Sequence, residues 1–437
     1  NTNVLVMTSG NLNDRPIIID PEEADKELDG KVDWIIHHNR PIYNRVDDSV
    51  VQFCGEQMCL LRRSRGYVPE PFFTDIDTEG IIAFGAEKTN TFALGKADTI
   101  IQSQHIGDLK NAETLAFYTE SLQRFRRLFR FTPQVAVCDL HPDYLSSVVA
   151  EQFANEHFIP LIKVQHHHAH AVACMTEYAI NEEVLAIVWD GTGLGDDGNS
   201  WGGEFLLCNR QKYKRLSHID YVAMPGGDRA SDEPWRMTVA YAKLYGLPLP
   251  DDFTARIGKE KIAFVSEMID KQINTPLTSG AGRLFDAFSS LLGICDFATR
   301  QAEAAQMLEQ VATDDYNSYY QILSEDDSLS VRFIFEGAIH DINGGLSTNF
   351  IAAKIHNTLA HLILEKSTEL RKKTKVSKVL LSGGCFQNKR LTEHLQRLFR
   401  EKNIPLFVPS QIPCNDAGVS VGQLVVAAEK LKEKIYA

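Results

Sequence analysis

Four histidines within five residues mark the part of the sequence best equipped for chemistry. His166, His167, His168 and His170 follow directly on an apolar segment, 158–164, which we expect to be a buried strand. If a helix begins near His166, then His166 and His170 lie four residues apart and share one face. Two neutral imidazoles so placed can bind one metal ion, with a carboxylate from elsewhere in the chain as a further ligand. The spacing fits such a metal site, and it equally fits the alternative that these histidines fill a turn, cap the helix or pack.

Two glycine-rich segments each follow an expected strand and have the composition of a phosphate-binding turn. In the first, 190–198, Asp190 ends the strand and can reach a metal, while Gly191 and Gly193 let backbone N–H groups approach phosphate oxygens. In the second, 382–388, a strand turns into a helix, so its backbone amides can meet an anion at the helix N-terminus. A plain hairpin and a tight strand-to-helix turn are the alternatives.

Four further features could bind a ligand, and each has a structural alternative. Asp416 begins the last expected helix, where a carboxylate can also serve as a simple cap. Asp286 lies among apolar residues of a helix, where a ribose hydroxyl or a salt bridge would satisfy it. The polar turn 8–11 could hold an anion or nucleotide, or simply join a strand to a helix. The basic cluster 62–65 suits phosphate, or forms a solvated edge strand.

The composition is that of a globular protein without broad affinity for nucleic acid. The chain has 437 residues, which predicts two or three domains, and 44% of them are hydrophobic, which is ample for a core. The net charge of −13 argues against electrostatic capture of nucleic acid. The sequence has no apolar run near the ~18 residues of a membrane span and no visible signal peptide.

The cysteines and the first residue indicate where the protein works and how much of it is present. Eight cysteines are scattered without a Cys-x-x-Cys pair, which fits reduced thiols in the cytoplasm rather than a zinc knuckle or a redox pair. The chain begins at Asn1, without an initiator methionine, on an expected strand at 4–7. We therefore expect a cytoplasmic protein of which this chain is a piece.

The elements that must position these residues fall into a short segment and two larger lobes. Residues 1–72 read as an α/β segment with strands at 4–7, 34–38 and 40–51, and residues 73–80 form a linker. The first lobe, 81–183, has three strands and then alternating helices and strands: strand 81–85, a hairpin over 91–102, helix 112–129, strand 134–139, helix 144–157, strand 158–164 and the histidine helix.

The second lobe, 184–437, repeats that order. Its expected elements are strands 184–190, 204–208 and 219–223, helices within 234–313, helix 348–372 with Ser347 as its N-cap, strand 379–381, helix 387–400, strand 406–408 and helix 417–434. A duplicated set of three strands followed by helices and strands is what an actin-like, sugar-kinase-like ATP-binding fold of two lobes requires. We therefore expect an α/β protein of this class.

Several long motifs then resemble one family, the carbamoyltransferases called HypF, which are hydrogenase maturation factors. The motifs lie at 165–170, 189–193, 201–204, 224–228 and 382–388. Residues 7–12, 39–51 and 63–69 resemble the end of the YrdC-like domain of that family. The resemblance covers nearly the whole chain. It implies a partial YrdC-like domain followed by a domain similar to the tRNA threonylcarbamoyl transferases.

The resemblance implies a reaction sequence that begins with carbamoyl phosphate and ATP. An acylphosphatase-like domain releases carbamate, and the YrdC-like domain joins it to ATP as carbamoyl-adenylate. The last domain passes the carbamoyl group to the C-terminal cysteine of the partner HypE. The product later becomes the cyanide ligands of the nickel–iron centre. No cysteine of this chain needs to be the nucleophile, and Cys385 is more plausibly a small apolar filler.

Carried over residue by residue, the resemblance gives this chain a set of sites. It implies a divalent iron or zinc ion, acting as a Lewis acid, with ligands at His166, His170, Asp190 and Asp416. It implies contacts to ATP, with its magnesium, or to carbamoyl-adenylate at Gly191, Thr192, Gly193, Gly383, Gly384 and Asn388. It also implies a ribose-binding acid at Asp286 and the YrdC-type serine and asparagine at Ser9 and Asn11.

Two departures from the family and several alternatives qualify this hypothesis. The acylphosphatase domain, the zinc-finger-like segments and the basic half of the YrdC domain have no counterpart here, so we expect transfer without synthesis of carbamoyl-adenylate. Asn13 and Asp14 replace a usual serine-glycine pair. The alternatives are a carbamoyltransferase acting on a small-molecule hydroxyl, a tRNA threonylcarbamoyl transferase, an actin-like ATPase or sugar kinase, and a non-catalytic scaffold for HypE.

Overall fold

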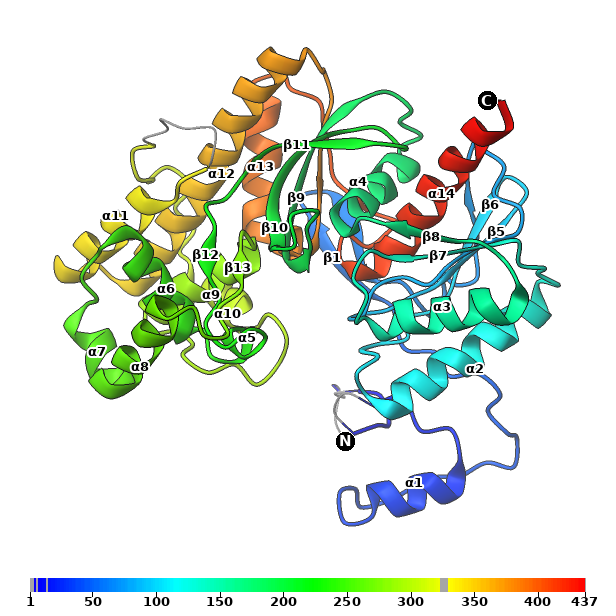
Figure 1. The fold of residues 1–437 in the computed structure, drawn as a ribbon. Helices are drawn as coiled ribbons and strands as arrows, with labels where there is room; N and C mark the ends of the chain where they lie inside the picture. The colour runs from blue at the N-terminus through cyan, green and yellow to red at the C-terminus, as the bar shows by residue number, and fades with distance from the viewer. Residues whose placement is uncertain (1–3, 5–6, 13–14, 323–328, 437) are drawn as a thin grey trace. The chain divides into compact units, whose positions relative to one another are not determined.

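The computed structural model describes residues 4, 7–12, 15–322 and 329–436, and it has the predicted mixed α/β character (Figure 1). The chain forms two compact units. The first consists of residues 1–52, 58–164 and 410–437, and the second of residues 53–57 and 165–409. These units follow spatial contacts, so the predicted domain limits at 72, 80 and 183 stay predictions.

The first unit is built on a six-stranded sheet in the order β3-β6-β5-β4-β7-β8. Its strands are β3 (Phe72–Phe73), β4 (Ile81–Ala83), β5 (Ala93–Lys96), β6 (Thr99–Gln102), β7 (Val135–Asp139) and β8 (Leu161–Val164). Its larger helices are α2 (Ala112–Leu128), α3 (Leu145–His157) and α14 (Val419–Tyr436), the last preceded by the 3-10 turn η2 (Asp416–Gly418). Figure 1 shows α3 and α14 on opposite faces of this sheet.

Continuous apolar sequence in its central strands explains why this sheet is covered on both faces. The strands β4 and β7 are buried along their whole length, as strands with helices on both sides must be. Helix α2 contributes one apolar face, which includes Phe117 and Phe125, to the core of the unit. Helix α2 begins at Asn111, whose side chain accepts hydrogen bonds from two backbone N–H groups of the first turn.

The N-terminal segment has less regular structure than predicted. It contains α1 (Pro21–Leu28), capped by Asp20, and the hairpin of β1 (Val50–Cys54) and β2 (Gln57–Arg62). The strand predicted at 34–38 is wrong: these residues form no strand, and Trp34 and Ile36 are 88% and 92% exposed. An apolar run predicts a strand only where a partner covers it. The strand predicted at 4–7 and the pair at 13–14 lie wholly or partly outside the described residues.

The second unit contains a seven-stranded sheet in the order β12-β13-β10-β9-β14-β15, and the seventh strand, β11, also pairs with β10. The strands are β9 (Val184–Leu194), β10 (Ser200–Cys208), β11 (Tyr213–His218), β12 (Val222–Ala223), β13 (Leu277–Thr278), β14 (Val379–Ser382) and β15 (Leu406–Phe407). Strand β9 pairs antiparallel with β10 and parallel with β14.

The predicted duplication is confirmed by the strand pairing. In the first unit, an antiparallel pair β4–β5 is extended by a second antiparallel pair β5–β6 on one side of β4, and a parallel pair β4–β7 is extended by the parallel pair β7–β8 on the other. The second unit repeats this with β10 and β11 on one side of β9 and with β14 and β15 on the other.

One strand of the repeat was predicted in the wrong place. The third strand of the second unit is β11 (213–218) and not 219–223, of which only Val222 and Ala223 are in a strand, β12. The segment Tyr213–His218 is rich in charge and mostly half-buried, as suits an edge strand, so its apolar signal is weak.

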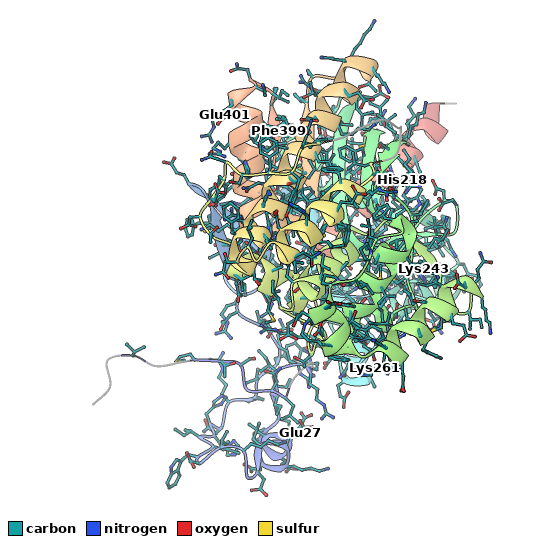
Figure 2. The ribbon with its side chains drawn as sticks, turned by 90° about the vertical axis from the view of Figure 1, so that its left-hand side faces the viewer. Glu27, His218, Lys243, Lys261, Phe399 and Glu401 are labelled. Atoms are coloured by element: carbon teal, nitrogen blue, oxygen red, sulfur yellow. The ribbon has the colours of Figure 1, made fainter. Side chains whose placement is uncertain are left out.

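Helices surround the second sheet. They are α4 (His166–Glu177), α5 (Arg229–Asp232), α6 (Trp235–Tyr245), α7 (Asp251–Ile257), α8 (Lys259–Asp270), α9 (Ala281–Leu291), α10 (Glu303–Val311), α11 (Arg332–Asn343), α12 (Thr348–Thr374) and α13 (Lys389–Glu401), with the 3-10 turn η1 (Gly384–Gln387) before α13. On α13, Phe399 lies in the core while Glu401 is exposed (Figure 2). No described helix has the length and apolar character needed to cross a membrane.

Candidate functional site

The histidine helix α4 begins at His166, which is the start that the metal hypothesis required. Gln165 is its N-cap, and the Gln165 Oε1 atom accepts a hydrogen bond of 2.8 Å from the backbone N–H of His168. The helix is buried along nearly its whole length, packed against β9, β10 and β14. A hydrogen bond of 2.8 Å from the Ser382 hydroxyl to the carbonyl of His170 ties the helix to the end of β14.

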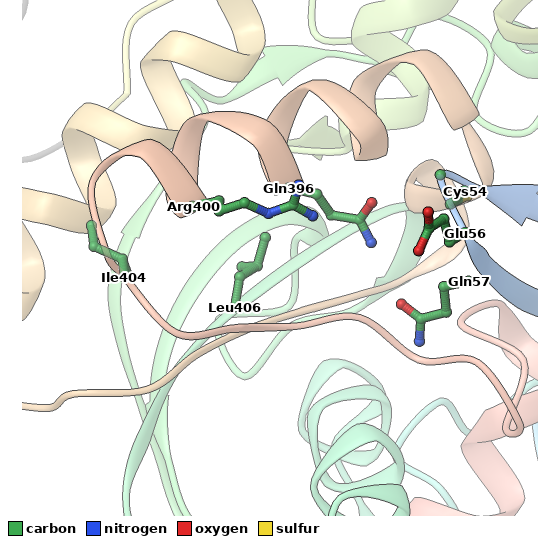
Figure 3. A pocket seen from close by; sticks show the side chains of 8 residues that line it. Cys54, Glu56, Gln57, Gln396, Arg400, Ile404 and Leu406 are labelled. Carbon is green, nitrogen blue, oxygen red and sulfur yellow. The ribbon is translucent and has the colours of Figure 1, made fainter.

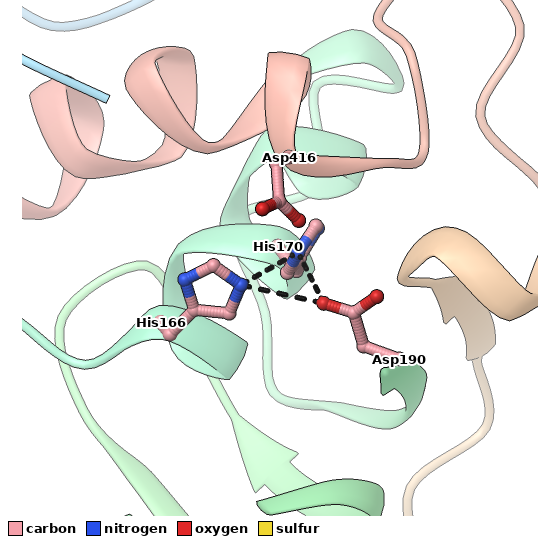
Figure 4. Close-up of side chains that lie close together, drawn as sticks. All are labelled: His166, His170, Asp190 and Asp416. Carbon is pink, nitrogen blue, oxygen red and sulfur yellow. Dashed lines mark hydrogen bonds and ion pairs between the residues drawn. The ribbon is translucent and has the colours of Figure 1, made fainter. Parts of the chain in front are cut away.

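Three side chains meet at one point beside this helix (Figure 4). The Nε2 atoms of His166 and His170 lie 3.2 Å apart, and each lies near Asp190 Oδ2, at 3.3 and 3.4 Å respectively. Both imidazoles are buried, and the Asp190 side chain is 10% exposed. The figure also draws Asp416, which belongs to the first unit.

The triangle formed by these three atoms fits a divalent cation. Ligand atoms about 2.1 Å from a tetrahedral ion are about 3.4 Å apart, which is close to the observed separations. Two imidazole nitrogens and a carboxylate oxygen suit iron or zinc. Buried polar groups so close together need a shared proton or a shared cation. The residues present therefore fit a metal.

The electrostatics of Asp190 support the same arrangement. Burial acts to raise the pKa of this carboxyl, but hydrogen bonds from His166 and His170 outweigh it and hold the pKa well below the ordinary value. The other oxygen, Oδ1, accepts a hydrogen bond of 3.1 Å from the backbone N–H of Gly384. Asp190 is therefore an oriented carboxylate that stays ionised near neutral pH.

The two inner histidines connect α4 to the glycine-rich hairpin. His167 Nδ1 accepts a hydrogen bond of 3.0 Å from Gln165, whose amide also donates to the carbonyl of Leu194 at 3.1 Å. His168 Nε2 lies 2.8 Å from the carbonyl of Asn209. These histidines hold the helix in register with β9 and β10 instead of filling a turn.

Other residues approach the backbone of β9 closely at its glycines, Gly191 and Gly193. A Cβ atom at Gly193 would lie 2.7 Å from the His167 ring and 2.8 Å from the His166 ring, so only glycine fits there without a shift. On the other side of the hairpin, Cβ atoms at Gly280 and Gly282 would lie within 2.4 and 2.8 Å of backbone atoms of Gly191. The N-terminus of α9 is thus pressed against Gly191, which concentrates unpaired backbone amides beside the hairpin.

Comparisons with known proteins agree across the whole chain. A family model described as "Carbamoyltransferase, Kae1-like Domain, second subdomain" matches residues 186–423. A second, "HypF Kae1-like domain", matches 77–177, and a Sua5/YciO/YrdC model described as "Telomere recombination" matches 1–64. The chain belongs to the HypF family.

Individual relatives show how much of a HypF protein is present. "Carbamoyltransferase HypF2" of Cupriavidus necator is 33% identical over 98% of this chain and 56% of its own length. A "Carbamoyltransferase HypF homolog" from the same organism is 32% identical over 81% of this chain and 93% of its own length. The chain therefore spans about half the length of the longer relatives.

A solved structure supports the fold over nearly the full length. The structure described as full-length HypF "in the phosphate- and nucleotide-bound form" is 35% identical and has a TM-score of 0.91, covering 97% of this chain and 67% of that chain. That HypF binds phosphate and a nucleotide, and the corresponding sites in this chain stay predictions.

The remaining residues matched to HypF nucleotide contacts have structural partners. Gly383 has φ of 98°, and a Cβ there would lie 2.3 Å from the carbonyl oxygen of Trp189. Asn388 caps α13 through Leu391 N–H at 2.9 Å, and its amide lies 3.0 Å from His356 Nε2. Thr192 shares a hydrogen bond of 2.7 Å with the hydroxyl of Ser200.

Asp286 is buried on α9. Burial raises its pKa, against the opposing charge of Arg283 at 2.7 Å. The structure thus shows the salt bridge that was one of the two predicted ways to satisfy this acid, and ribose binding stays a prediction.

Ser9, Asn11 and Asp416 belong to the first unit and are described with it. Ser9 Oγ donates to Asn11 Oδ1 at 2.5 Å, and Asn11 Nδ2 donates to the carbonyl of Arg15 at 2.7 Å, so the turn is closed by its own side chains. Asp416 begins η2 and follows the N-cap Asn415, whose Oδ1 accepts from Ala417 N–H. Their roles toward a nucleotide and a metal stay predictions.

A separate cavity of about 590 Å³ lies in the second unit (Figure 3). It is lined by the tip of the β1–β2 hairpin and by residues of α13 and β15, among them Glu56, Gln396 and Arg400. Leu406 in its wall pairs with Val379 at the start of β14, whereas Gly383 and Gly384 follow the end of that strand. The cavity is therefore remote from the histidine and aspartate cluster.

Sequence reasoning missed two side chains beside the hairpin. Glu204 is fully buried, and Arg215 is bound to it through a contact of 2.5 Å between Arg215 Nε and Glu204 Oε2. Glu204 ends a motif that carried the HypF resemblance. Arg215 lies in a strand that the sequence did not reveal, so no local signal pointed to it.

Proposed function

We propose that this chain performs the carbamoyl transfer of the HypF reaction. The carbamoyl group would pass from carbamoyl-adenylate to the thiol of the C-terminal cysteine of HypE, as a step toward the cyanide ligands of nickel–iron hydrogenase. The observation that carries this proposal is the meeting of His166, His170 and Asp190 at one buried point, in a chain of the HypF family. The cytoplasmic location stays a prediction with it.

We assign synthesis of the carbamoyl-adenylate, from carbamoyl phosphate and ATP with magnesium, to the acylphosphatase-like and YrdC-like domains of HypF; this chain matches the YrdC model over residues 1–64. The chain spans 56–58% of its full-length relatives. We propose that the residues matched by the two Kae1-like models, 77–177 and 186–423, perform the transfer from this adenylate.

The metal proposed here is one divalent iron or zinc ion. His166, His170 and Asp190 would hold it, and Asp416 would be the fourth ligand. When bound, such an ion supplies positive charge that polarises a carbonyl or phosphoryl oxygen.

The residues of the chain have distinct tasks in this proposal. Asp190 Oδ1 accepts a hydrogen bond from the N–H of Gly384, which fixes the direction of the second oxygen, Oδ2. The backbone amides near Gly191 and at the start of α9 would orient the phosphate of the adenylate and stabilise its charge as AMP leaves. Both imidazoles are buried, and this burial would limit the access of water to a bound adenylate and so favour the thiol over hydrolysis.

Among the alternatives, one has support from a comparison. A "tRNA N6-adenosine threonylcarbamoyltransferase" of Syntrophus aciditrophicus is 31% identical, but over 84 residues that cover only 19% of this chain. The net charge of −13 disfavours a tRNA substrate. A small-molecule hydroxyl as acceptor and a scaffold role without transfer are outcomes that the following experiment separates.

The test is carbamoylation of HypE by the purified chain. The upstream part of a full-length HypF, ATP and carbamoyl phosphate would supply the adenylate, and mass spectrometry would locate the adduct. We expect an adduct on the terminal cysteine with the wild-type chain, none with His166→Ala, and a normal amount with the control His340→Ala, whose histidine is exposed on α11.

Each other outcome has a defined meaning. Absence of the adduct with the wild-type chain would refute the proposed function, and a metal-loaded chain without transfer would identify a scaffold. An undiminished adduct with His166→Ala would remove the metal role. If tRNA or a small hydroxyl compound became carbamoylated while HypE stayed unmodified, that molecule would be the acceptor.

A further inference from the structure

The Arg215 side chain contacts residues from several elements around the glycine-rich hairpin 190–198. Its Nε atom lies 2.5 Å from Glu204 Oε2 on β10. Its Nη1 atom donates to Asp197 at 3.3 Å and to the hydroxyl of Tyr221 at 2.8 Å. Its Nη2 atom donates to Ser279 Oγ at 3.3 Å. One guanidinium therefore joins the tip of the hairpin, strand β10 and the residue that leads into α9.

Glu204 is the buried counterpart of this guanidinium. Its side chain is fully buried, and its Oε1 atom accepts hydrogen bonds from the backbone N–H groups of Gly202 and Gly203, at 3.1 and 3.2 Å. The same oxygen accepts from the Ser279 hydroxyl at 2.5 Å. A buried carboxylate is stable only when its hydrogen bonds are satisfied, and here Ser279 and Arg215 complete them.

Trp201 links the same network to the histidine helix. The Arg215 guanidinium lies 4.1 Å from the Trp201 ring centroid, and the indole N–H donates to Asp197 at 2.9 Å. Trp201 is the cross-strand partner of Gly193, and its ring lies 6.0 Å from that of His167.

The position of Ser279 shows what this network controls. Ser279 directly precedes Gly280, the N-cap of α9, and the backbone at Gly280 and Gly282 is pressed against Gly191. The Arg215–Glu204 pair thus holds Ser279, the residue before the N-cap of α9, through hydrogen bonds to both of its members. The distance between the amides of α9 and the backbone at Gly191 depends on these contacts.

We propose that Arg215, acting through Glu204 and Ser279, is a positioning residue for nucleotide phosphate, because it sets the spacing between Gly191 and the N-terminal amides of α9. The identity of the nucleotide, ATP or an adenylate, rests on the proposed function. We expect metal binding to be independent of Arg215, because the direct contacts that position His170 and Asp190 come from Ser382 and Gly384.

The test compares Arg215→Lys with Arg256→Lys. Arg256 is a matched control in the same unit, since it also forms an ion pair with two carboxylates, of Asp252 and Asp296, and donates to a carbonyl, that of Ser290. Binding of MgATP would be measured by calorimetry, metal content by elemental analysis, and thermal unfolding by circular dichroism.

We expect Arg215→Lys to raise the Kd for MgATP about tenfold or more, because lysine cannot bridge Glu204, Asp197 and Ser279 together. Metal content should equal that of the wild-type chain, and Arg256→Lys should leave the Kd unchanged. A Kd for Arg215→Lys within about twofold of that for Arg256→Lys would overturn the proposal. Loss of metal in parallel with MgATP would also overturn it.

A second variant, with a smaller change in the side chain, covers the case in which Arg215→Lys fails to fold. Ser279→Ala removes only the bridge to α9, and we expect it to weaken MgATP binding about fivefold, with less than additive loss in the double variant with Arg215→Lys. Full additivity would show that the two residues act separately and would contradict the proposal. A wild-type chain that binds no MgATP would overturn it too, whereas MgATP binding without carbamoylation of HypE would refute only the proposed function.

Discussion

The contact between Gly193 and the histidine helix gives a sharp prediction. In Gly193→Ala, the new Cβ would lie 2.7 Å from His167 Cε1 and 2.8 Å from His166 Cδ2. Carbon atoms pack at about 3.5 Å or more, so the rings or the hairpin must move by roughly 0.8 Å. The three ligand atoms are separated by only 3.2–3.4 Å, and a displacement of this size takes His166 Nε2 out of bonding distance.

We expect Gly193→Ala to lower the metal affinity about 100-fold, equivalent to about 2.7 kcal/mol, which is the upper end for changes beside metal ligands. Competition with a chelator, followed by elemental analysis, would measure this. The matched control is Gly191→Ala, two residues away on the same strand, because a Cβ there has no atom within 4 Å. That variant should bind metal normally.

Two results would refute this reasoning. One is a Gly193→Ala chain whose metal affinity stays within about twofold of the wild-type value. The other is equal loss of metal in Gly191→Ala, which would show that the hairpin acts through its flexibility rather than through contact with the histidine rings.

Three further predictions concern stability. Burial lowers the pKa of His356 from 6.5 to about 4, so its neutral form is favoured in the folded chain; stability from this residue is present above pH 6.5 and falls as the pH drops toward 4. Urea unfolding at pH 7 and pH 5 should show an acid loss about 2 kcal/mol smaller in His356→Gln than in the wild-type chain, and an equal loss in both would contradict it. Gly383→Ala should lower the free energy of unfolding by about 3 kcal/mol or more, because its Cβ meets the Trp189 carbonyl. The control Gly345→Ala has positive φ but open space, so it should lower it by only about 1–2 kcal/mol in the same denaturation assay. Similar losses in the two variants would refute the steric argument. Asn388→Ala should lower the free energy of unfolding by about 1 kcal/mol through loss of the α13 cap, and no change would show that the cap is dispensable.

Part of the fold followed directly from local patterns in the sequence. A helix starting near His166 was expected because the apolar segment 158–164 leads into the histidines, and the structure adds that Gln165 is the N-cap. The duplicated order of strands was visible because β4 and the first part of β9, 184–189, are apolar. Buried strands and glycine-rich turns can be recognised from local sequence, because a run of apolar residues or a group of glycines marks them whatever distant residues they contact.

Other parts depend on contacts that no local pattern reveals. The segment at 34–38 has the composition of a strand but has no strand partner, and β11 is a strand although its sequence is highly charged. The role proposed for Arg215 depends on its hydrogen bond to Ser279, which lies 64 positions away in the sequence. The cap formed by Asn388 depends on α13, and the second contact of its side chain, with His356, depends on α12.

The central claim is that His166, His170 and Asp190 hold one divalent metal ion. X-ray absorption spectroscopy at the metal edge of the purified chain tests it most directly. We expect one iron or zinc ion per chain, with two imidazole nitrogens and carboxylate oxygen at about 2.0–2.2 Å. A chain that lacks imidazole in the metal shell, or carries no stoichiometric metal, and yet carbamoylates HypE would contradict the claim.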